Sequence, residues 1–369
     1  MWRRVDLGLS LLIGAALTGI LFGMSAGEIF SSAGAALVEY HTIELIIAVV
    51  LIIGMGYLMK LGGQLTIMVN SLDRLVRDRR VSMVIPPALI GLLPSPGGAM
   101  LSAPMVGESG DKLGLSPEDK TFINFWFRHL WEYFWPLYPG LIVAAAILKI
   151  QIPEMMRVQW PLSVAAIISG TLLGLLPVKN GGETDDEQVS FRSAFWRFNV
   201  SILPIWLILI GLMFLGLPIL VILAAVFIFT LLRLKNPWNE RWAAVRKAIS
   251  WKVTLLLLAV MIFKRIVMDS SAVEAVPMVL EASGVPPFIP LLVVPLLIGL
   301  LTGVNQAYVG IAFPLLLPYF IQGDEVNLIY VMFAYTTGFI GVLLAPVHLC
   351  LLLTKEYYGA KWGGIYKKL

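Results

Sequence analysis

The sequence predicts an all-α polytopic membrane protein with about eight transmembrane helices, two re-entrant helical hairpins and two inverted repeats. Three observations predict this fold class. The composition is too apolar for a soluble chain, several apolar runs are long enough to span a bilayer, and the order of segments repeats along the chain.

The composition excludes an ordinary soluble enzyme. Of 369 residues, 59% are hydrophobic and 14% are charged, and the mean hydropathy is +0.86; soluble domains have about 25% charged residues. The net charge of +4 does not indicate nucleic-acid binding. Cys350 is the only cysteine, so one chain cannot build an internal disulfide or a thiolate metal cluster. Metalloprotease, nucleophile-elbow and Walker motifs are absent from the sequence, so we expect neither an enzyme nor a nucleotide-driven pump.

Apolar runs predict the membrane spans, because a helix needs about 20 residues to cross roughly 30 Å of hydrocarbon. The first run follows Arg3 and Arg4 and has some features of a signal peptide, but the repeat described below requires it as a helix. The predicted spans are 7–24, 42–62, 121–149, 158–177, 197–215, 217–234, 250–268 and 327–354.

Two further apolar stretches, 84–107 and 286–320, are interrupted in the middle. In the first, Pro94 and Pro96 flank Ser95 and two glycines follow, a pattern that does not continue a helix. About ten residues remain on either side, or roughly 15 Å of helix, half a bilayer. These stretches predict re-entrant hairpins whose tips are buried or face a cavity.

An even number of crossings places both termini on one side of the membrane. If that side is the cytoplasm, most of the 27 Lys and Arg residues lie inside. The basic residues on or near the outer side are Lys149, Arg157, Lys264 and Arg265. The sequence therefore predicts an integral protein of the cytoplasmic membrane with cytoplasmic N- and C-termini.

A shift of 208 residues (298 − 90 = 208) aligns Ile90-Gly-Leu-Leu93 with Ile298-Gly-Leu-Leu301 and, without a gap, Pro87 with Pro295. The predicted division is a first repeat at 1–157 containing the hairpin 84–107, connecting helices and a cytoplasmic loop at 158–215, and a second repeat at 216–369 containing the hairpin 286–320. Each repeat has an odd number of crossings, so the two are inverted. The alternative is chance alignment of leucine-rich helices. Inverted repeats with broken helices are typical of secondary transporters, which bind substrate near the midplane.

The hairpin tips are the candidate substrate-binding sites. The helix that leaves each tip points its N-terminus, with about half a positive charge, toward a ligand, which favours an anion. Asn305 offers an amide donor and a carbonyl acceptor that suit a carboxylate or a Na⁺ ion. The alternative is that these groups only cap broken helices. The candidates are Ser95, Gly97, Gly98, Ser102, Thr302, Gly303, Asn305 and Gln306.

Ionisable residues inside spans are costly and are therefore functional candidates for charge neutralisation or coupling. Arg128 and Glu132 are four residues apart, and a structural ion pair on one helix face is the favoured interpretation. His348 is interpreted equally as a satisfied buried histidine or as a ligand or proton site. The candidates are Lys60, Arg128, His129, Glu132, Asp269 and His348, with Lys264 and Arg265 expected to reach the outer face.

The runs 91–106, Gly-Leu-Leu-Pro-Ser-Pro-Gly-Gly-Ala-Met-Leu-Ser-Ala-Pro-Met-Val, and 338–348, Gly-Phe-Ile-Gly-Val-Leu-Leu-Ala-Pro-Val-His, resemble DUF401, a family of prokaryotic integral membrane proteins. That family is similar to the ion transporter superfamily, which includes gluconate, citrate, dicarboxylate and arsenite carriers. The resemblance implies a homodimer in which a scaffold holds two transport domains that move as elevators. The dicarboxylate branch has Ser-Asn-Thr at both tips, whereas here the first tip has Pro-Ser-Pro and only the second has an asparagine, Asn305.

These observations predict a secondary active transporter of a small, organic anion, coupled to Na⁺ or H⁺ and needing no other cofactor. The first alternative is a cation/proton antiporter that uses Asp269, Glu132 or the histidines as proton carriers. The further alternative is a membrane scaffold or sensor that does not transport. The expected partners are the lipid bilayer, the anionic substrate and a second copy of the chain.

Overall fold

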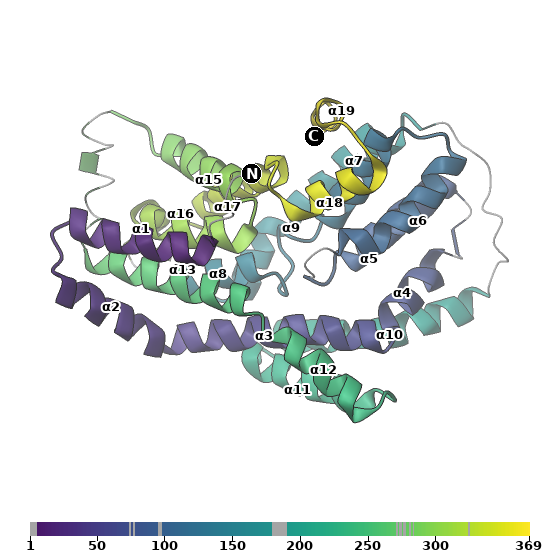
Figure 1. Ribbon diagram of the computed structural model, residues 1–369, viewed down its shortest axis with the longest axis horizontal. Coiled ribbons are helices and arrows are strands. Elements are labelled where there is room, and N and C mark those ends of the chain that lie inside the picture. The colour runs from purple at the N-terminus through teal and green to yellow at the C-terminus, as the bar shows by residue number, and fades with distance from the viewer. Residues whose placement is uncertain are drawn as a thin grey trace. The chain divides into compact units, whose positions relative to one another are not determined.

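The computed structural model is built almost entirely of helices (Figure 1). It describes residues 6–73, 75–76, 78–94, 98–178, 190–270, 272, 275, 278–279, 282, 284–323 and 325–369. Up to residue 178 the helices are α1 (Leu7–Leu21), α2 (Ala26–Val38), α3 (Tyr40–Leu61), α4 (Gln64–Asp73), α5 (Arg79–Ile90), α6 (Ala99–Lys112), α7 (Pro117–Arg128), α8 (Pro139–Leu148) and α9 (Ile152–Gly170), which continues into the π-helical turn η1 (Thr171–Leu175).

From residue 190 the helices are α10 (Phe191–Met213), α11 (Ile219–Arg233), α12 (Trp238–Ala248), α13 (Trp251–Asp269), α15 (Phe288–Thr302), α16 (Asn305–Phe320), α17 (Leu328–Leu344), α18 (Leu349–Tyr358) and α19 (Trp362–Tyr366). A short antiparallel pair, β1 (Ile321–Gln322) with β2 (Glu325–Val326), links α16 to α17. The all-α prediction is therefore confirmed.

Four helical segments in the described part of the chain are long and apolar enough to cross a membrane: Tyr40–Leu61, Ile152–Leu175, Phe191–Met213 and Leu328–Tyr358. The predicted runs 7–24 and 217–234 form the shorter apolar helices α1 and α11, and 250–268 forms α13. The membrane character of the chain is confirmed. The total of about eight crossings remains a prediction.

Two of the predicted spans are interrupted helices, although residues 328–354 of the second still lie within the apolar segment Leu328–Tyr358. The run 121–149 divides into α7 and α8 around non-helical residues 129–138, and the run 327–354 divides into α17 and α18 around 345–348. Proline accounts for the last residue of the first break and for the start of the second, because it disfavours helical geometry in the preceding residue. Tyr138, before Pro139, has φ −83° and ψ 126°, and Ala345, before Pro346, has φ −68° and ψ 123°.

The chain forms two compact units, each assembled from separated stretches. The first unit comprises Met1–Val49, Tyr138–Gln159 and Ile249–His348, and the second comprises Val50–Leu137, Trp160–Ala248 and Leu349–Leu369. The predicted repeats concern the order of segments along the chain, and they remain a prediction.

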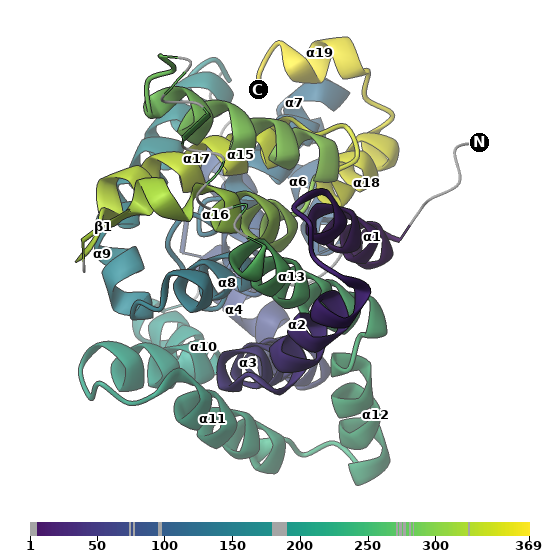
Figure 2. The ribbon, with the colours of Figure 1, turned by 90° about the vertical axis from the view of Figure 1, so that its left-hand side faces the viewer.

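In the first unit, α15 and α16 pack against each other as the two arms of a hairpin, and α17 lies along α15 (Figures 1 and 2). Glycines allow this close crossing: a Cβ added at Gly299 would lie 3.0 Å from the Val342 backbone N, and one at Gly341 would lie 2.9 Å from the Leu300 backbone N. Helix α8 packs on α16, and α13 contacts α1, α2 and α16. The second interrupted stretch is therefore a helical hairpin held by α8, α13 and α17.

In the second unit, α5 and α6 form the other hairpin, which packs on α7, while α18 contacts α6 and α7 (Figure 1). Gly91, just after α5, lies against the Arg128 backbone carbonyl at the end of α7. Helix α4 contacts α5 and α10, and α10 contacts α11. Leu58 of α3 packs with Leu234, which directly follows α11, and with Ala244 on α12.

Candidate functional site

The hairpin of the first unit reverses within two residues. Helix α15 ends at Thr302, and Gly303 has φ +63°, a left-handed conformation that suits glycine. Its backbone N–H donates to the Gly299 carbonyl at 2.8 Å. Val304 is extended, and α16 begins at Asn305. A side chain at 303 would be excluded on steric grounds too, because its Cβ would lie 3.0 Å from the His348 backbone N.

The Asn305 side chain lies where two helices begin. It is buried, with 6% of its surface exposed, and it is the first residue of α16. Its carboxamide packs directly on Gly140, the second residue of α8, where an added Cβ would lie 2.6 Å from the Asn305 Cγ. Helices α8 and α16 are neighbours in Figure 2. The first unit therefore brings two helix N-termini together at one amide side chain.

Both of these N-termini lack the usual side-chain cap. Tyr138 before α8 and Val304 before α16 make no capping side-chain hydrogen bond, and neither first turn contains an acidic residue. A helix N-terminus carries roughly half a positive charge, which an N-cap or an acidic residue normally offsets. Two of them in a buried place create a positive potential that suits an anionic group.

The other predicted residues near this tip differ in what they offer. His348 is buried, with 7% exposed; its Nδ1 lies 3.2 Å from the Val342 carbonyl, and its backbone packs on Gly303. The Thr302 hydroxyl donates to the Ile298 carbonyl at 2.8 Å, so its proton is used in a hydrogen bond within α15. Gln306 is half-buried. The structure thus groups Gly303, Asn305 and His348.

The hairpin of the second unit has a longer break, between Ile90 and Ala99, and the predicted residues Ser95 and Gly97 lie outside the described residues. Gly98 precedes α6 without a side-chain cap. Ser102 is fully buried, and its hydroxyl donates to the Ala99 carbonyl at 3.3 Å. The predicted Ser102 is therefore within one turn of this tip.

Sequence reasoning missed Asn124, which lies on α7 and is fully buried. Its Nδ2 donates to the Ala99 carbonyl at 3.0 Å and to the Thr354 hydroxyl at 3.1 Å, so one amide joins α7, α6 and α18. Its Oδ1 has no hydrogen-bond partner among the described residues. The signal in the sequence is an amide within the apolar run Phe122-Ile-Asn-Phe-Trp126.

The expectation that Arg128 and Glu132 share one face of a helix is wrong, because α7 ends at Arg128; their ion pair remains a prediction. Instead, His129 caps the helix and its Nε2 lies 3.7 Å from the Glu132 Oε1, while its Nδ1 lies 2.6 Å from the Phe125 carbonyl. Arg128, His129 and Glu132 are all buried. They form a polar cluster at a helix C-terminus, where positive charge is favourable.

The remaining charge candidates lie elsewhere. Asp269 accepts hydrogen bonds from Arg265 Nε at 2.8 Å and from Ser32 Oγ at 2.7 Å. Lys264 is buried with its Nζ 3.7 Å from the Glu39 Oε1, contrary to the expectation that it reaches outward, whereas Arg265 is partly exposed. Lys60 is exposed in the last turn of α3.

In a comparison with protein-family models, the model described as "Protein of unknown function (DUF401)" matches residues 1–369. A comparison with curated proteins finds no match.

Proposed function

The chain belongs to the DUF401 family over its whole length, and we propose that it is a secondary active transporter of a small organic anion, coupled to Na⁺ or H⁺. The substrate anion binds at the hairpin tip of the first unit. One observation carries this proposal: two uncapped helix N-termini, those of α8 and α16, meet at the buried Asn305.

Broken helices in a membrane chain support transport as the reason for this arrangement. Backbone groups freed by a break are costly in hydrocarbon unless protein or a water-filled cavity satisfies them. Secondary transporters use such breaks to bind substrate and coupling ion. Here the tip at Gly303, the break 129–138 before α8 and the break 345–348 after α17 all end at this site.

Inverted repeats are part of the proposal, and the helix boundaries support them. A shift of 208 residues brings the starts of seven helices in the first half within four residues of the start of a helix in the second. The pairs are α1 with α11, α2 with α12, α3 with α13, α5 with α15, α6 with α16, α7 with α17 and α8 with α18. The packing matches as well: α15 with α17 corresponds to α5 with α7, and α16 with α8 corresponds to α6 with α18.

The coupling ion in this proposal is Na⁺ held by the Asn305 carbonyl oxygen, or H⁺ carried by His348, whose backbone packs on Gly303 of the same tip. Following the superfamily resemblance, the transporter is a homodimer of the cytoplasmic membrane with cytoplasmic termini, and its hairpins move against a scaffold as an elevator. Oxygen ligands suit Na⁺, whereas an imidazole exchanges protons, so the two ions make different predictions for the pH dependence of transport.

Thermal-shift measurements on the purified full-length protein test the proposal. The protein is screened with organic and inorganic anions in Na⁺ and in choline buffers, and a stabilising anion is then assayed for uptake into proteoliposomes. We expect Asn305→Ala to abolish the stabilisation and to weaken anion affinity about tenfold or more. Asn199→Ala is the matched control, because the Asn199 Nδ2 donates to the Phe195 carbonyl within its own helix, α10. No anion response from the native protein would refute anion transport.

A second candidate function is cation/proton antiport, which the buried His129–Glu132 pair favours. An antiporter should release protons when Na⁺, K⁺ or Li⁺ is added on the opposite side of a liposome membrane, and Glu132→Gln should abolish this release. A scaffold or sensor should instead tolerate both Asn305→Ala and Glu132→Gln.

A further inference from the structure

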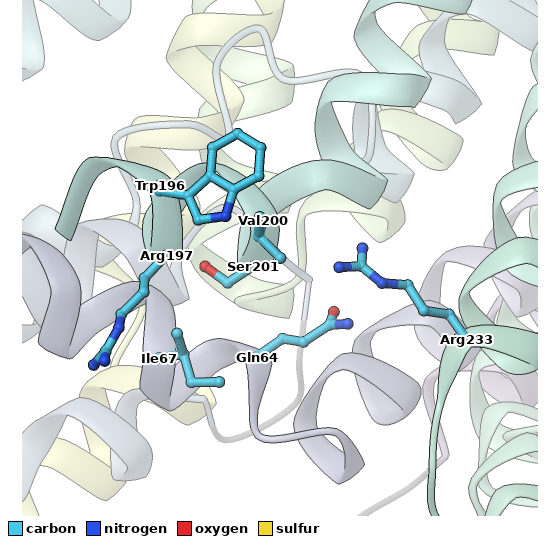
Figure 3. Close-up of a pocket in the computed structure, with 7 residues that line it drawn as sticks. All are labelled: Gln64, Ile67, Trp196, Arg197, Val200, Ser201 and Arg233. Atoms are coloured by element: carbon cyan, nitrogen blue, oxygen red, sulfur yellow. The ribbon is translucent and has the colours of Figure 1, made fainter. Parts of the chain in front are cut away.

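A cavity of about 260 Å³ lies inside the second unit, remote in sequence from both hairpin tips. Three elements line it: the start of α4, the first half of α10 and the end of α11. Figure 3 shows Gln64 and Ile67 on one side, Trp196 and Ser201 on another, and Arg233 opposite them. The proposed transport site does not use this cavity.

The cavity is positively charged. Arg197 and Arg233 line it, no Asp or Glu does, and within the described part of the chain neither arginine forms an ion pair. In Figure 3 the Arg233 guanidinium points inward toward Gln64, whereas that of Arg197 points away toward the rim. Gln64 is also the first residue of α4, so the helix N-terminus adds partial positive charge. This combination suits a phosphate group.

The cavity also offers a hydrogen-bond acceptor. The Gln64 Oε1 is buried and has no partner among the described residues. The Ser201 hydroxyl donates to the Phe198 carbonyl at 2.7 Å, which leaves its oxygen able to accept. A ligand that presents phosphate oxygens to Arg233 and hydroxyl hydrogens to Gln64 would satisfy both kinds of group.

The mouth of the cavity is apolar and open. Ile67 is 44% exposed and Trp196 is 69% exposed, and the neighbouring Phe195 and Phe191 on α10 are exposed as well. Tryptophan and arginine together are typical of the bilayer interface. The predicted topology places the end of α3, the start of α10 and the end of α11 at the cytoplasmic side, where basic pockets between helices bind anionic lipid headgroups.

We propose that this cavity binds the phosphate of an anionic phospholipid of the cytoplasmic leaflet whose headgroup carries free hydroxyls, as phosphatidylglycerol does. Arg233 binds the phosphate, Gln64 accepts from a headgroup hydroxyl, and Trp196 with Ile67 covers the upper part of the acyl chains.

Lipid binding to the delipidated full-length protein, measured by native mass spectrometry in a non-ionic detergent, tests this proposal. We expect phosphatidylglycerol to bind about fivefold tighter than phosphatidylcholine, and Arg233→Gln to remove this preference. Arg246→Gln on α12 is the matched control: it removes the same charge from an exposed helix outside the cavity and should leave binding within about twofold. Equal binding of the two lipids, or full binding by Arg233→Gln, would overturn the proposal.

Two further arms distinguish the source of the phosphate and the role of Gln64. Inorganic phosphate alone, at millimolar concentration, should not raise the melting temperature as phosphatidylglycerol does; an equal rise that Arg233→Gln abolishes would assign the cavity to a soluble anion and overturn the lipid. Gln64→Leu should weaken phosphatidylglycerol about threefold and leave phosphatidic acid, which has no headgroup hydroxyl, nearly unchanged. Equal weakening of both lipids would overturn the hydroxyl contact.

Discussion

The two hairpins share a packing device and differ in where their polar chemistry lies. Gly91 follows α5 and rests on the Arg128 carbonyl, and Gly299 within α15 rests on the Gly338 carbonyl. In the first unit the amide, Asn305, is on the tip itself. In the second unit the amide, Asn124, comes from the helix that packs against the hairpin. The comparison teaches that glycine fixes how each hairpin crosses its neighbour, while the polar group can move from one helix to another.

We expect the largest effect from substitutions of the glycines that both hairpins use for close packing. Gly91→Ala and Gly299→Ala place a methyl group against a backbone carbonyl, which cannot move away as a side chain can. We expect each to destabilise the protein by about 3 kcal/mol, measured as melting temperature and as yield of monodisperse protein. Gly56→Ala on α3 is the control, because no atom lies within 4 Å of its added Cβ. Native stability in either hairpin variant would show that the crossing is not fixed by glycine.

The next effect separates the two amides. We expect Asn124→Ala to lower the free energy of unfolding by about 1–3 kcal/mol, because it removes the two hydrogen bonds by which this buried side chain of α7 joins α6 and α18. Asn305→Asp should change stability less but weaken anion affinity at least about tenfold, because it adds negative charge where two helix N-termini meet. If both variants lost stability and neither lost anion affinity, both amides would have a structural role and neither would bind the anion.

A smaller effect sharpens the position of Asn305. Gly140→Ala puts a Cβ 2.6 Å from the Asn305 Cγ, so the carboxamide must shift. We expect the apparent anion affinity to fall about fivefold in a binding titration while the protein stays folded. Gly34→Ala on α2, where nothing lies within 4 Å of the new methyl group, should leave affinity unchanged. An unchanged affinity in Gly140→Ala would place the ligand away from α8.

The smallest effect concerns how the helix beside each hairpin begins. Helix α17 is capped by Asn327, whereas α7 is capped by Ser116 and is also bound by the C-terminal segment, because the Lys361 N–H donates to Glu118 Oε1 at 2.8 Å. That hydrogen bond lowers the pKa of Glu118 below its usual 4.5. The contribution to stability is therefore present above about pH 4.5 and is lost as the pH falls through the lowered pKa.

Glu118→Gln should consequently make the melting temperature fall slightly less as the pH is lowered below about 4.5. At pH 7 we expect it to change the melting temperature by about 1 °C. Limited proteolysis of the C-terminal segment reports the same contact. An identical fall of the melting temperature in the two proteins would show that the segment is not held through Glu118.

Much of the helical plan could be predicted from the sequence, because length and apolarity alone identify runs such as 42–62 and 197–215. The breaks at 129–138 and 345–348 could not be predicted from proline alone. Pro204 lies inside α10 and Pro295 inside α15 without ending either helix, since neighbouring groups in a membrane protein can satisfy the freed backbone carbonyl. Which proline ends a helix depends on tertiary contacts.

The candidate site was predicted in part, for similar reasons. Gly303 and Asn305 were visible as turn and amide residues, whereas the contact of Asn305 with Gly140 joins residues 165 positions apart (305 − 140) and leaves no local signal. Asn124 was overlooked because an uncharged amide in an apolar run carries a weaker energetic penalty than a charge.

The interleaving of the two compact units has a consequence for biosynthesis. The first unit includes residues up to His348 and the second includes Leu349–Leu369, so neither can complete its packing before these late segments have been synthesised. The earliest helices, α1 and α2, must wait in the membrane for α13 to be inserted. Contacts of such long sequence separation slow folding and prolong exposure of unfinished surfaces. Deletion of α18 should therefore destabilise the early helices α6 and α7, which it contacts, as severely as late ones. A cell making this protein would need to keep insertion and quality-control factors bound until that helix is inserted.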